Sequence, residues 1–209
     1  MKLLILGATG NTGKQVVKQA LEQKHEVTVL VRQPTKLGSL ARQVKVIIGN
    51  VLDKEALAKA LRGNEAIIST LGVGDSFKSN NIISEAVHVL IPAMNDEGIK
   101  RLIFVSGFGV GNTLQYANFL QNFFFKYVLN DIYSDKGKAD EEIRNSNLNW
   151  TLVYPVKYTN GALTGKYSAG ERLTMFGFPT ISRANVAHFL LAQLTDTSFL
   201  KKEVIIKYY

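Results

Sequence analysis

The sequence of 209 residues contains no cysteine. Disulfide bonds, thiolate nucleophiles and cysteine-ligated metals are therefore excluded, and this absence is typical of proteins in a reducing cytosol. Histidine is also scarce, and His25, His88 and His188 lack the close spacing of metal ligands. We expect a cytoplasmic protein without a bound metal.

Long apolar runs and clustered charges are missing as well. No run approaches the ~18 residues of a membrane span, and residues 1–6 are too few for a signal peptide. The formal net charge is +8, but the basic residues are dispersed, without a basic stripe that carries interleaved aromatic residues. We therefore expect neither a membrane nor a nucleic acid as partner, and a preference for small anionic ligands.

Strand-like and helix-like segments alternate along the sequence, as in a parallel sheet with crossover helices. We expect strands at residues 3–6, 26–31, 44–48, 65–70, 101–105, 149–153 and 203–206. Helices are expected at 14–21, 53–61, 80–97 and 183–195, with two more in 114–146 that are separated by a break near 130–134. The pattern predicts one α/β domain over residues 1–209. It is a Rossmann-type, doubly wound, mostly parallel sheet flanked by helices, with a small C-terminal extension on the substrate side.

A glycine-rich turn, Gly7–Gly13, joins the first strand to the first helix, which is the setting in which a dinucleotide pyrophosphate binds. Gly7 allows the tight turn, Gly10 lets the backbone approach a phosphate, and Gly13 lets the helix pack on the strand. The polar side chains between them are expected to cap the helix, whose first N–H groups attract an anion: Thr9, Asn11 and Thr12.

Further segments follow this turn in a characteristic order: Leu30–Arg32, Gly49–Asp53, Ile103–Ser106, Leu148–Pro155 and Ile181–Ala187. Together with the glycine turn they resemble the atypical short-chain dehydrogenase/reductase superfamily. The best match within it is the NmrA-like group, which includes NAD(P)H-dependent flavin reductases and biliverdin-IXβ reductase. The resemblance implies a dinucleotide cofactor and covers nearly the whole chain.

The end of the second strand favours NADP(H) as the cofactor, with NAD(H) as the alternative. An NAD site needs an acidic residue about 20 residues beyond the glycine turn to accept from the ribose hydroxyls. Residues 27–33 contain no acid, and the strand ends at Arg32, which can pair with a 2′-phosphate. Lys36 adds a nearby positive charge.

The resemblance also implies where the rest of the cofactor lies. It places Asn50 and Val51 near the adenine, and Thr70, Leu71 and Gly72 along the ribose and nicotinamide. Two more residues of the site follow the sixth strand: Tyr154 and Pro155. Asp53 is expected to cap the helix that follows it, and a role for it in binding is left open.

The reaction centre departs from the family pattern. Typical members use Tyr-x-x-x-Lys, in which the lysine lowers the pKa of the tyrosine so that it can exchange a proton. Alignment by the following strand places Lys138 at the lysine, Ser134 at the tyrosine, and Tyr133 one residue away. We therefore take Lys138, Tyr133 and Ser106, which ends the fifth strand, as the catalytic candidates.

Without the usual tyrosine acid, an acceptor that takes hydride into a delocalised system is favoured. We expect a planar acceptor such as a flavin or a quinone, with its proton coming from water. The alternative is a non-catalytic, redox-sensing regulator of the NmrA type that contacts a protein partner. A sugar-nucleotide epimerase is less favoured, and the protein is expected to be a monomer or a homodimer.

One segment is strongly aromatic: Tyr116, Phe119, Leu120, Phe123, Phe124, Phe125 and Tyr127. The first four have the spacing of one helix face and are expected to pack in the core, whereas Phe124 and Phe125 lie off that face. Two interpretations remain open. The helix is either deeply buried or in a subunit contact, or it forms an aromatic wall that stacks a planar acceptor.

Overall fold

The structure is a computed structural model of the chain, and it describes residues 1–74, 76 and 78–209. Its strands are β1 (Lys2–Leu6), β2 (Glu26–Val31), β3 (Lys45–Ile48), β4 (Ala66–Ser69), β5 (Arg101–Val105), β6 (Asn149–Pro155), β7 (Lys157–Thr159), β8 (Ser168–Gly170), β9 (Thr180–Ser182) and β10 (Lys202–Lys207). Its α-helices are α1 (Asn11–Glu22), α2 (Lys54–Leu61), α3 (Ile82–Asp96), α4 (Phe119–Tyr127), α5 (Asn130–Arg144) and α6 (Arg183–Ala192). Two 3₁₀ segments, η1 (Pro34–Arg42) and η2 (Gly111–Tyr116), complete the described elements.

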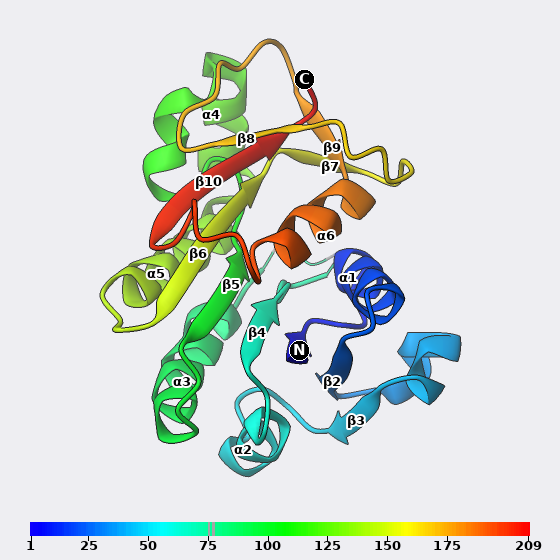
Figure 1. Cartoon of the computed structure of the whole chain (residues 1–209). Helices are drawn as coiled ribbons and strands as arrows, with labels where there is room; N and C mark the ends of the chain where they lie inside the picture. The colour runs from blue at the N-terminus through cyan, green and yellow to red at the C-terminus, as the bar shows by residue number, and fades with distance from the viewer. Residues whose placement is uncertain (75, 77) are drawn as a thin grey trace.

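The central sheet has the order β3-β2-β1-β4-β5-β6-β10-β8 over the described residues (Figure 1). All neighbours run parallel except β8, which pairs with β10 in the antiparallel sense. The apolar run Leu3–Leu6 is fully buried, as expected for a parallel strand that is covered on both faces. The predicted doubly wound α/β fold is therefore confirmed.

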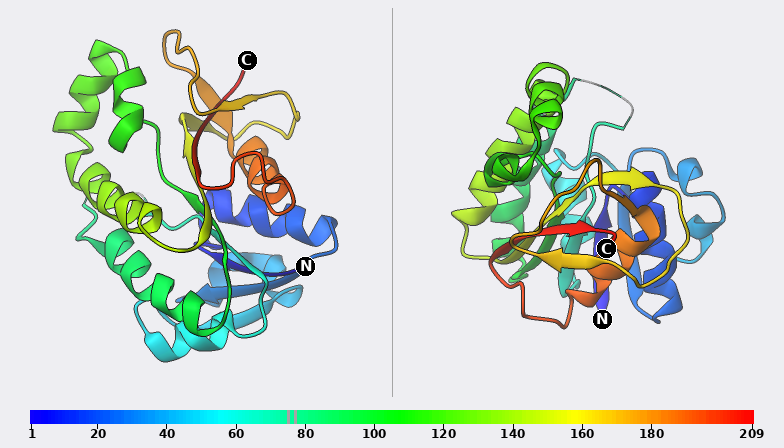
Figure 2. Two further views of the ribbon diagram at one scale, coloured as in Figure 1. Left: turned by 60° about the vertical axis from the view of Figure 1, so that its left-hand side comes forward. Right: turned by 90° about the horizontal axis from the view of Figure 1, so that it is seen from above.

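The helices cover the two faces of the sheet in separate groups. Helix α1 packs against α6 on one face, and α3 packs against α5 and α2 on the other (Figures 1 and 2). Strands β1 and β4 are neighbours in the sheet. From β1 the chain continues to β2 on one side of this pair, and from β4 it continues to β5 on the other side. A crevice therefore opens beyond the carboxyl ends of these two strands, where open α/β sheets bind their ligands.

Helix α2 begins as the sequence predicts. The Asp53 carboxylate accepts hydrogen bonds from the backbone N–H groups of Glu55, at 3.0 Å, and Ala56, at 3.2 Å. These bonds satisfy two of the N–H groups that a helix start leaves without partners. The prediction of Asp53 as an N-cap is thus confirmed.

The predicted break near residues 130–134 was misplaced. Helix α4 ends at Tyr127, and α5 begins at Asn130, so residues 130–134 are helical. Their polar side chains suit a first helical turn, since Asp131 lies at the positive end of the helix dipole. The break between the two helices lies at residues 128–129 instead.

The prediction that the aromatic face of α4 packs in the core was wrong. Phe119, Leu120 and Phe123 are 83%, 65% and 59% exposed. Phe125, which lies off that face, packs instead against Phe108 and Tyr133, with ring centroids 6.2 Å and 5.0 Å apart. The helix thus contacts the protein through a face that the sequence periodicity did not single out.

Candidate functional site

The glycine turn brings the ends of β1 and β4 together. Gly7 has a φ of +76°, and a Cβ atom there would lie only 2.5 Å from the backbone oxygen of Thr70. The Thr70 hydroxyl also donates to the Leu6 carbonyl at 3.0 Å, which ties the two strands together beyond their last ladder bonds. A Cβ atom on Gly13 would clash with the Gly7 carbonyl, so α1 approaches the turn closely only without a side chain.

The N-terminus of α1 lacks the predicted caps. Gly10 occupies the N-cap position in an extended conformation, and within the described residues it receives no side-chain cap. Thr12 instead lies beside Tyr158 in the cleft lining. The expectation that Thr9, Asn11 and Thr12 cap this helix failed because the N-cap residue itself has no side chain. The first-turn N–H groups are consequently left for an anion.

A cleft of about 810 Å³ opens at this turn, within the roughly 300–1,000 Å³ of ligand sites. All but two of the predicted cofactor residues line it. Those that line it are Gly7, Thr9, Gly10, Asn11, Thr12, Gly13, Arg32, Lys36, Asn50, Val51, Thr70, Leu71 and Gly72. The exceptions are Tyr154 and Pro155, which are buried in β6. Their assignment assumed that the end of β6 reaches the cleft, whereas the Tyr154 hydroxyl donates to buried Asp140 at 3.0 Å.

The charges around the cleft are of one sign. Arg32, Lys36, Lys78, Lys136 and Arg183 line it, and the described lining residues include no Asp or Glu. Such a cleft attracts an anionic ligand. Together with the uncapped helix and the side-chain-free turn, this charge fits the phosphates of a dinucleotide.

The structure brings Lys136, rather than the predicted Lys138, to the cleft. The Lys136 ammonium donates to the Ser106 carbonyl at 2.7 Å, whereas the exposed Lys138 donates to Asn81 at 3.1 Å. Two residues turn a helix by about 200°, so these lysines lie on nearly opposite sides of α5. The inner face of α5 is marked by the buried residues Ala139, Asp140 and Ile143. They follow Lys136 at the spacing of one helix face, which is the sequence signal that would have favoured Lys136.

The two other catalytic candidates, Tyr133 and Ser106, do not line the cleft. The Tyr133 hydroxyl donates to the Phe108 carbonyl at 3.0 Å, and burial raises its pKa. Ser106 is 1% exposed, and its hydroxyl donates to Asp140 at 2.7 Å.

Asp140 is the centre of a buried polar cluster that sequence reasoning missed. It is 0% exposed, and its Oδ2 atom accepts from both Ser106 and Tyr154. Burial raises its pKa to about 6, while these two hydrogen bonds and the charges of Lys136 and Arg144 act in the opposite direction. Its Oδ1 atom has no hydrogen-bond partner among the described residues.

Burial has the converse effect on Lys136. It lowers the pKa of the ammonium, while the carboxylates of Asp140 and Asp135 oppose this shift. An amine with a lowered pKa gives up its proton more readily near neutral pH. Lys136 therefore combines access to the cleft with a proton that can be transferred.

Tyr158 and Arg183 were also missed as residues of the site. The Arg183 guanidinium lies 5.0 Å from the centre of the Tyr158 ring and donates to Asn160 at 2.7 Å. Burial raises the pKa of Tyr158 to about 12, although neighbouring Thr12 and Arg183 lower it. The Arg183 contacts join the start of α6 to β7 and the residue that follows β7.

Most of the sequence matches a known protein family. The model of the NAD(P)H-binding family matches residues 7–197. The chain belongs to this family. The fold and the relatives also agree with the predicted resemblance to NmrA-like atypical short-chain dehydrogenases/reductases.

Two relatives of this NAD(P)H-binding protein have names that describe different roles. It is 30% identical to the uncharacterized sugar epimerase YhfK of Bacillus subtilis, over 94% of this chain and 89% of YhfK. It is 31% identical to the photosystem II assembly factor Ycf39 of Synechocystis, over 80% of this chain. The match covers only 48% of Ycf39, so the chain spans about half of that relative.

A solved structure shares the fold over nearly its whole length. ChuY, an anaerobilin reductase from Escherichia coli O157:H7, aligns with a TM-score of 0.82 and 24% identity, covering 99% of this chain and 96% of ChuY. In the described parts of the present structure, no three His, Asp or Glu side chains are grouped to hold a metal ion. No described helix has the length and apolarity to cross a membrane.

The assignment of Lys136 to the cleft can be tested without any ligand. Lys136→Met removes a positive charge near Asp140, so the pKa of Asp140 should rise further above about 6. Lys138→Met, on the opposite side of α5, should leave it unchanged. Carboxyl ¹³C NMR titration measures both, and equal behaviour of the two variants would contradict the assignment.

Proposed function

We propose that the protein is an NADPH-dependent reductase of a planar acceptor such as a flavin or a quinone. The observation that carries this proposal is the arrangement of the cleft. A phosphate-binding turn lies in it together with a partly desolvated lysine, Lys136. The family match supports the dinucleotide, and the resemblance in fold to ChuY supports a reductase.

The residues of the cleft divide into groups that would hold each part of the cofactor. The amides at the start of α1 and the glycine turn would bind the pyrophosphate. Arg32 and Lys36 would bind the 2′-phosphate of NADPH, and Asn50 and Val51 would flank the adenine. When bound, NADPH would supply the hydride.

Lys136 would supply the proton. An acceptor that has taken up a hydride carries an additional negative charge, and the ammonium of Lys136 can neutralise it by donating one proton. The resulting amine would regain a proton from water that enters the open cleft. This role replaces the tyrosine acid, whose nearest counterpart, Tyr133, donates to the Phe108 carbonyl.

A second candidate function is the redox-sensing regulator. The exposed aromatic face of α4 favours it, since a regulator needs a surface for a partner. Such a protein would bind the cofactor with an affinity that depends on its redox state and would not turn it over. Turnover therefore separates the two functions.

NADPH oxidation, followed by absorbance with FMN, riboflavin and menadione in turn, tests the reductase. Wild-type protein should oxidise NADPH with at least one of them. Lys136→Met should lower kcat by ~10²–10⁴-fold, as expected for loss of a general acid. Lys138→Met serves as the matched control and should stay near wild type. Tight NADPH binding without turnover of any acceptor would contradict the reductase and favour the regulator.

Arg32 should determine the preference for NADPH over NADH. A hydrogen bond to a charged group contributes about 1.5–3 kcal/mol, so Arg32→Ala should weaken NADPH binding by roughly 10–150-fold. NADH lacks the 2′-phosphate, and its affinity should change little. Calorimetric titration measures both, with Arg62→Ala, at the end of α2, as the control. An equal loss for the two cofactors would contradict NADP(H) specificity.

A further inference from the structure

One end of the molecule carries an apolar surface that the cofactor cleft does not use. We call it the apolar end and define it by these residues: Phe119, Leu120, Phe123, Phe124 and Tyr127 of α4, with Phe176 and Phe178 from the connection between β8 and β9. Phe176 is 81% exposed and Phe178 is 60% exposed. The Asn118 side chain donates to the Gly177 carbonyl at 3.1 Å, which ties the two segments together.

The size of the apolar end marks it as an interaction surface. A whole aromatic side chain has roughly 150–250 Å² of surface, and six of these seven residues are aromatic, each exposed by 46% or more. Their exposed area is on the order of 600–1,000 Å², which reaches or exceeds the roughly 300–600 Å² of the largest patch on a typical monomer. Exposure of this extent is the opposite of what the sequence pattern of α4 predicted.

The helix is firmly placed despite its exposed face. Asn118 and Gln121 form a reciprocal capping box at its start, with both bonds at 2.9 Å. On its inner side Phe125 packs over Gly109, where a Cβ atom would lie 2.5 Å from the ring. The aromatic side chains of the outer face are therefore presented on an anchored helix.

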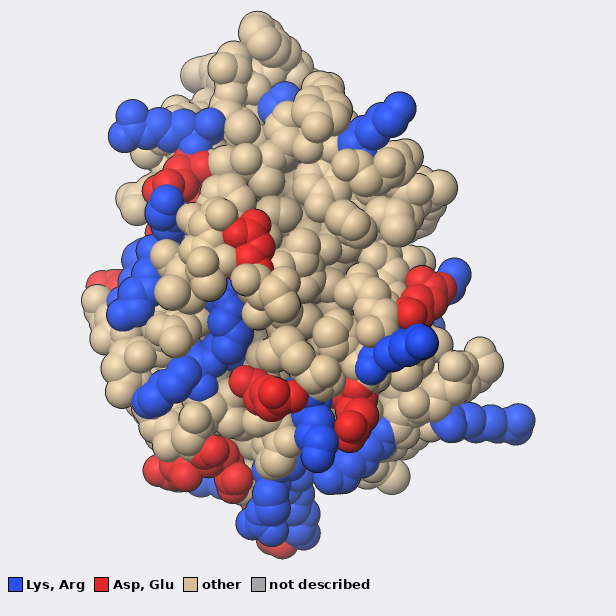
Figure 3. Space-filling model, in the orientation of Figure 1, with Lys and Arg blue, Asp and Glu red and all other residues tan. Residues whose placement is uncertain are grey.

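The charges around the apolar end are predominantly positive. Residues 107–131 and 156–182, which contain it, carry four basic and two acidic residues: Lys126, Lys157, Lys166, Arg172, Asp131 and Glu171. All four basic side chains are exposed. Glu171, the neighbour of Arg172, pairs with Lys202 at the start of β10, at 3.1 Å. In Figure 3 the uppermost part of the molecule shows tan surface with a few blue side chains, and a red patch lies directly below the blue side chain at upper left.

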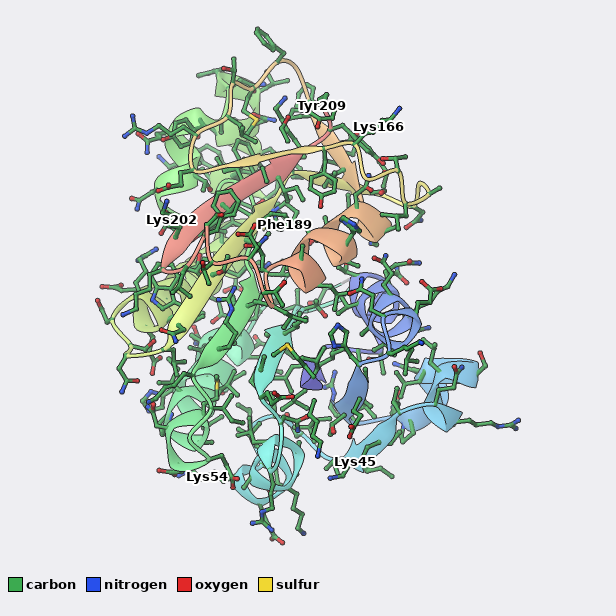
Figure 4. The ribbon with its side chains drawn as sticks, viewed as in Figure 1. Lys45, Lys54, Lys166, Phe189, Lys202 and Tyr209 are labelled. Carbon is green, nitrogen blue, oxygen red and sulfur yellow. The ribbon has the colours of Figure 1, made fainter. Side chains whose placement is uncertain are left out.

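The apolar end lies at one extremity of the molecule. Helix α4 and the β8–β9 connection project at the same extremity of the molecule, where the chain also ends (Figures 1 and 2). Lys166 and Tyr209 lie at this extremity as well (Figure 4). Helices that lie in the interface of a membrane carry aromatic and leucine side chains on one face and basic side chains on the other. Helix α4 carries exposed aromatic and leucine side chains and one lysine, Lys126.

We propose that the apolar end docks on the surface of an anionic lipid bilayer. The Phe and Leu side chains enter the interface, and the surrounding lysines and arginine attract the negatively charged headgroups. A second copy of the chain fits this surface less well, because pairing two such ends would bring the basic side chains together. The proposal departs from the sequence-based expectation of no membrane partner, and it does not depend on the proposed reductase activity.

Sedimentation with lipid vesicles tests the docking. Wild-type protein should bind vesicles of phosphatidylcholine with one quarter phosphatidylglycerol at least ~10-fold more tightly than vesicles of phosphatidylcholine alone, and salt should weaken the binding. Phe119→Ser combined with Phe123→Ser should reduce binding by at least ~10-fold. Ile48→Ser is the matched control, because Ile48 is a 68% exposed apolar residue on β3, outside the apolar end. Circular dichroism verifies that each variant is folded.

Three results would overturn the docking proposal. The first is the absence of binding to the anionic vesicles. The second is an equal loss of binding in the Ile48→Ser control. The third is a wild-type dimer, seen by light scattering, that the double serine variant dissociates, since a second copy would then cover the surface. Lys126→Glu, which changes only charge, should weaken binding even where the double variant fails to fold.

Discussion

The close approach of β1 and β4 is the constraint on which the rest of the site depends. Gly7 and Thr70 meet so closely that any side chain at Gly7 would displace the β4 backbone. This contact lies at the point where the strand order reverses, between β1 and β4. Helix α1 begins there, and the backbone amides of its first turn have no side-chain cap. The basic side chains that follow β2 and those of α5 and α6 line the cleft that opens there.

A second level of organisation is the buried cluster around Asp140. It connects β5, β6 and α5 through Ser106, Tyr154 and Lys136. A buried carboxylate near a lysine favours the charged form of that lysine, while burial favours the neutral form. Lys136 lies between these opposing effects, which is a suitable position for a group that exchanges protons.

The sequence alone predicted the fold and most residues that line the cleft at the glycine turn, because strand periodicity and glycine spacing are local signals. Helix α2 began at its predicted cap for the same reason. The errors arose where tertiary contacts decide. Lys136 was missed because an alignment shift of two residues reverses a helix face, and α4 was assigned to the core because its periodicity does not reveal which face is covered. Asp140 was missed because α5 contains several charged residues, and only the tertiary structure shows that this one is buried.

We propose that the cleft holds NADPH with its nicotinamide near Lys136, and a crystal structure with bound NADP⁺ would test this placement. We predict the pyrophosphate on the first turn of α1, the 2′-phosphate between Arg32 and Lys36, and the nicotinamide beside the Lys136 ammonium. A cofactor whose 2′-phosphate points away from Arg32, or whose nicotinamide lies far from Lys136, would contradict it.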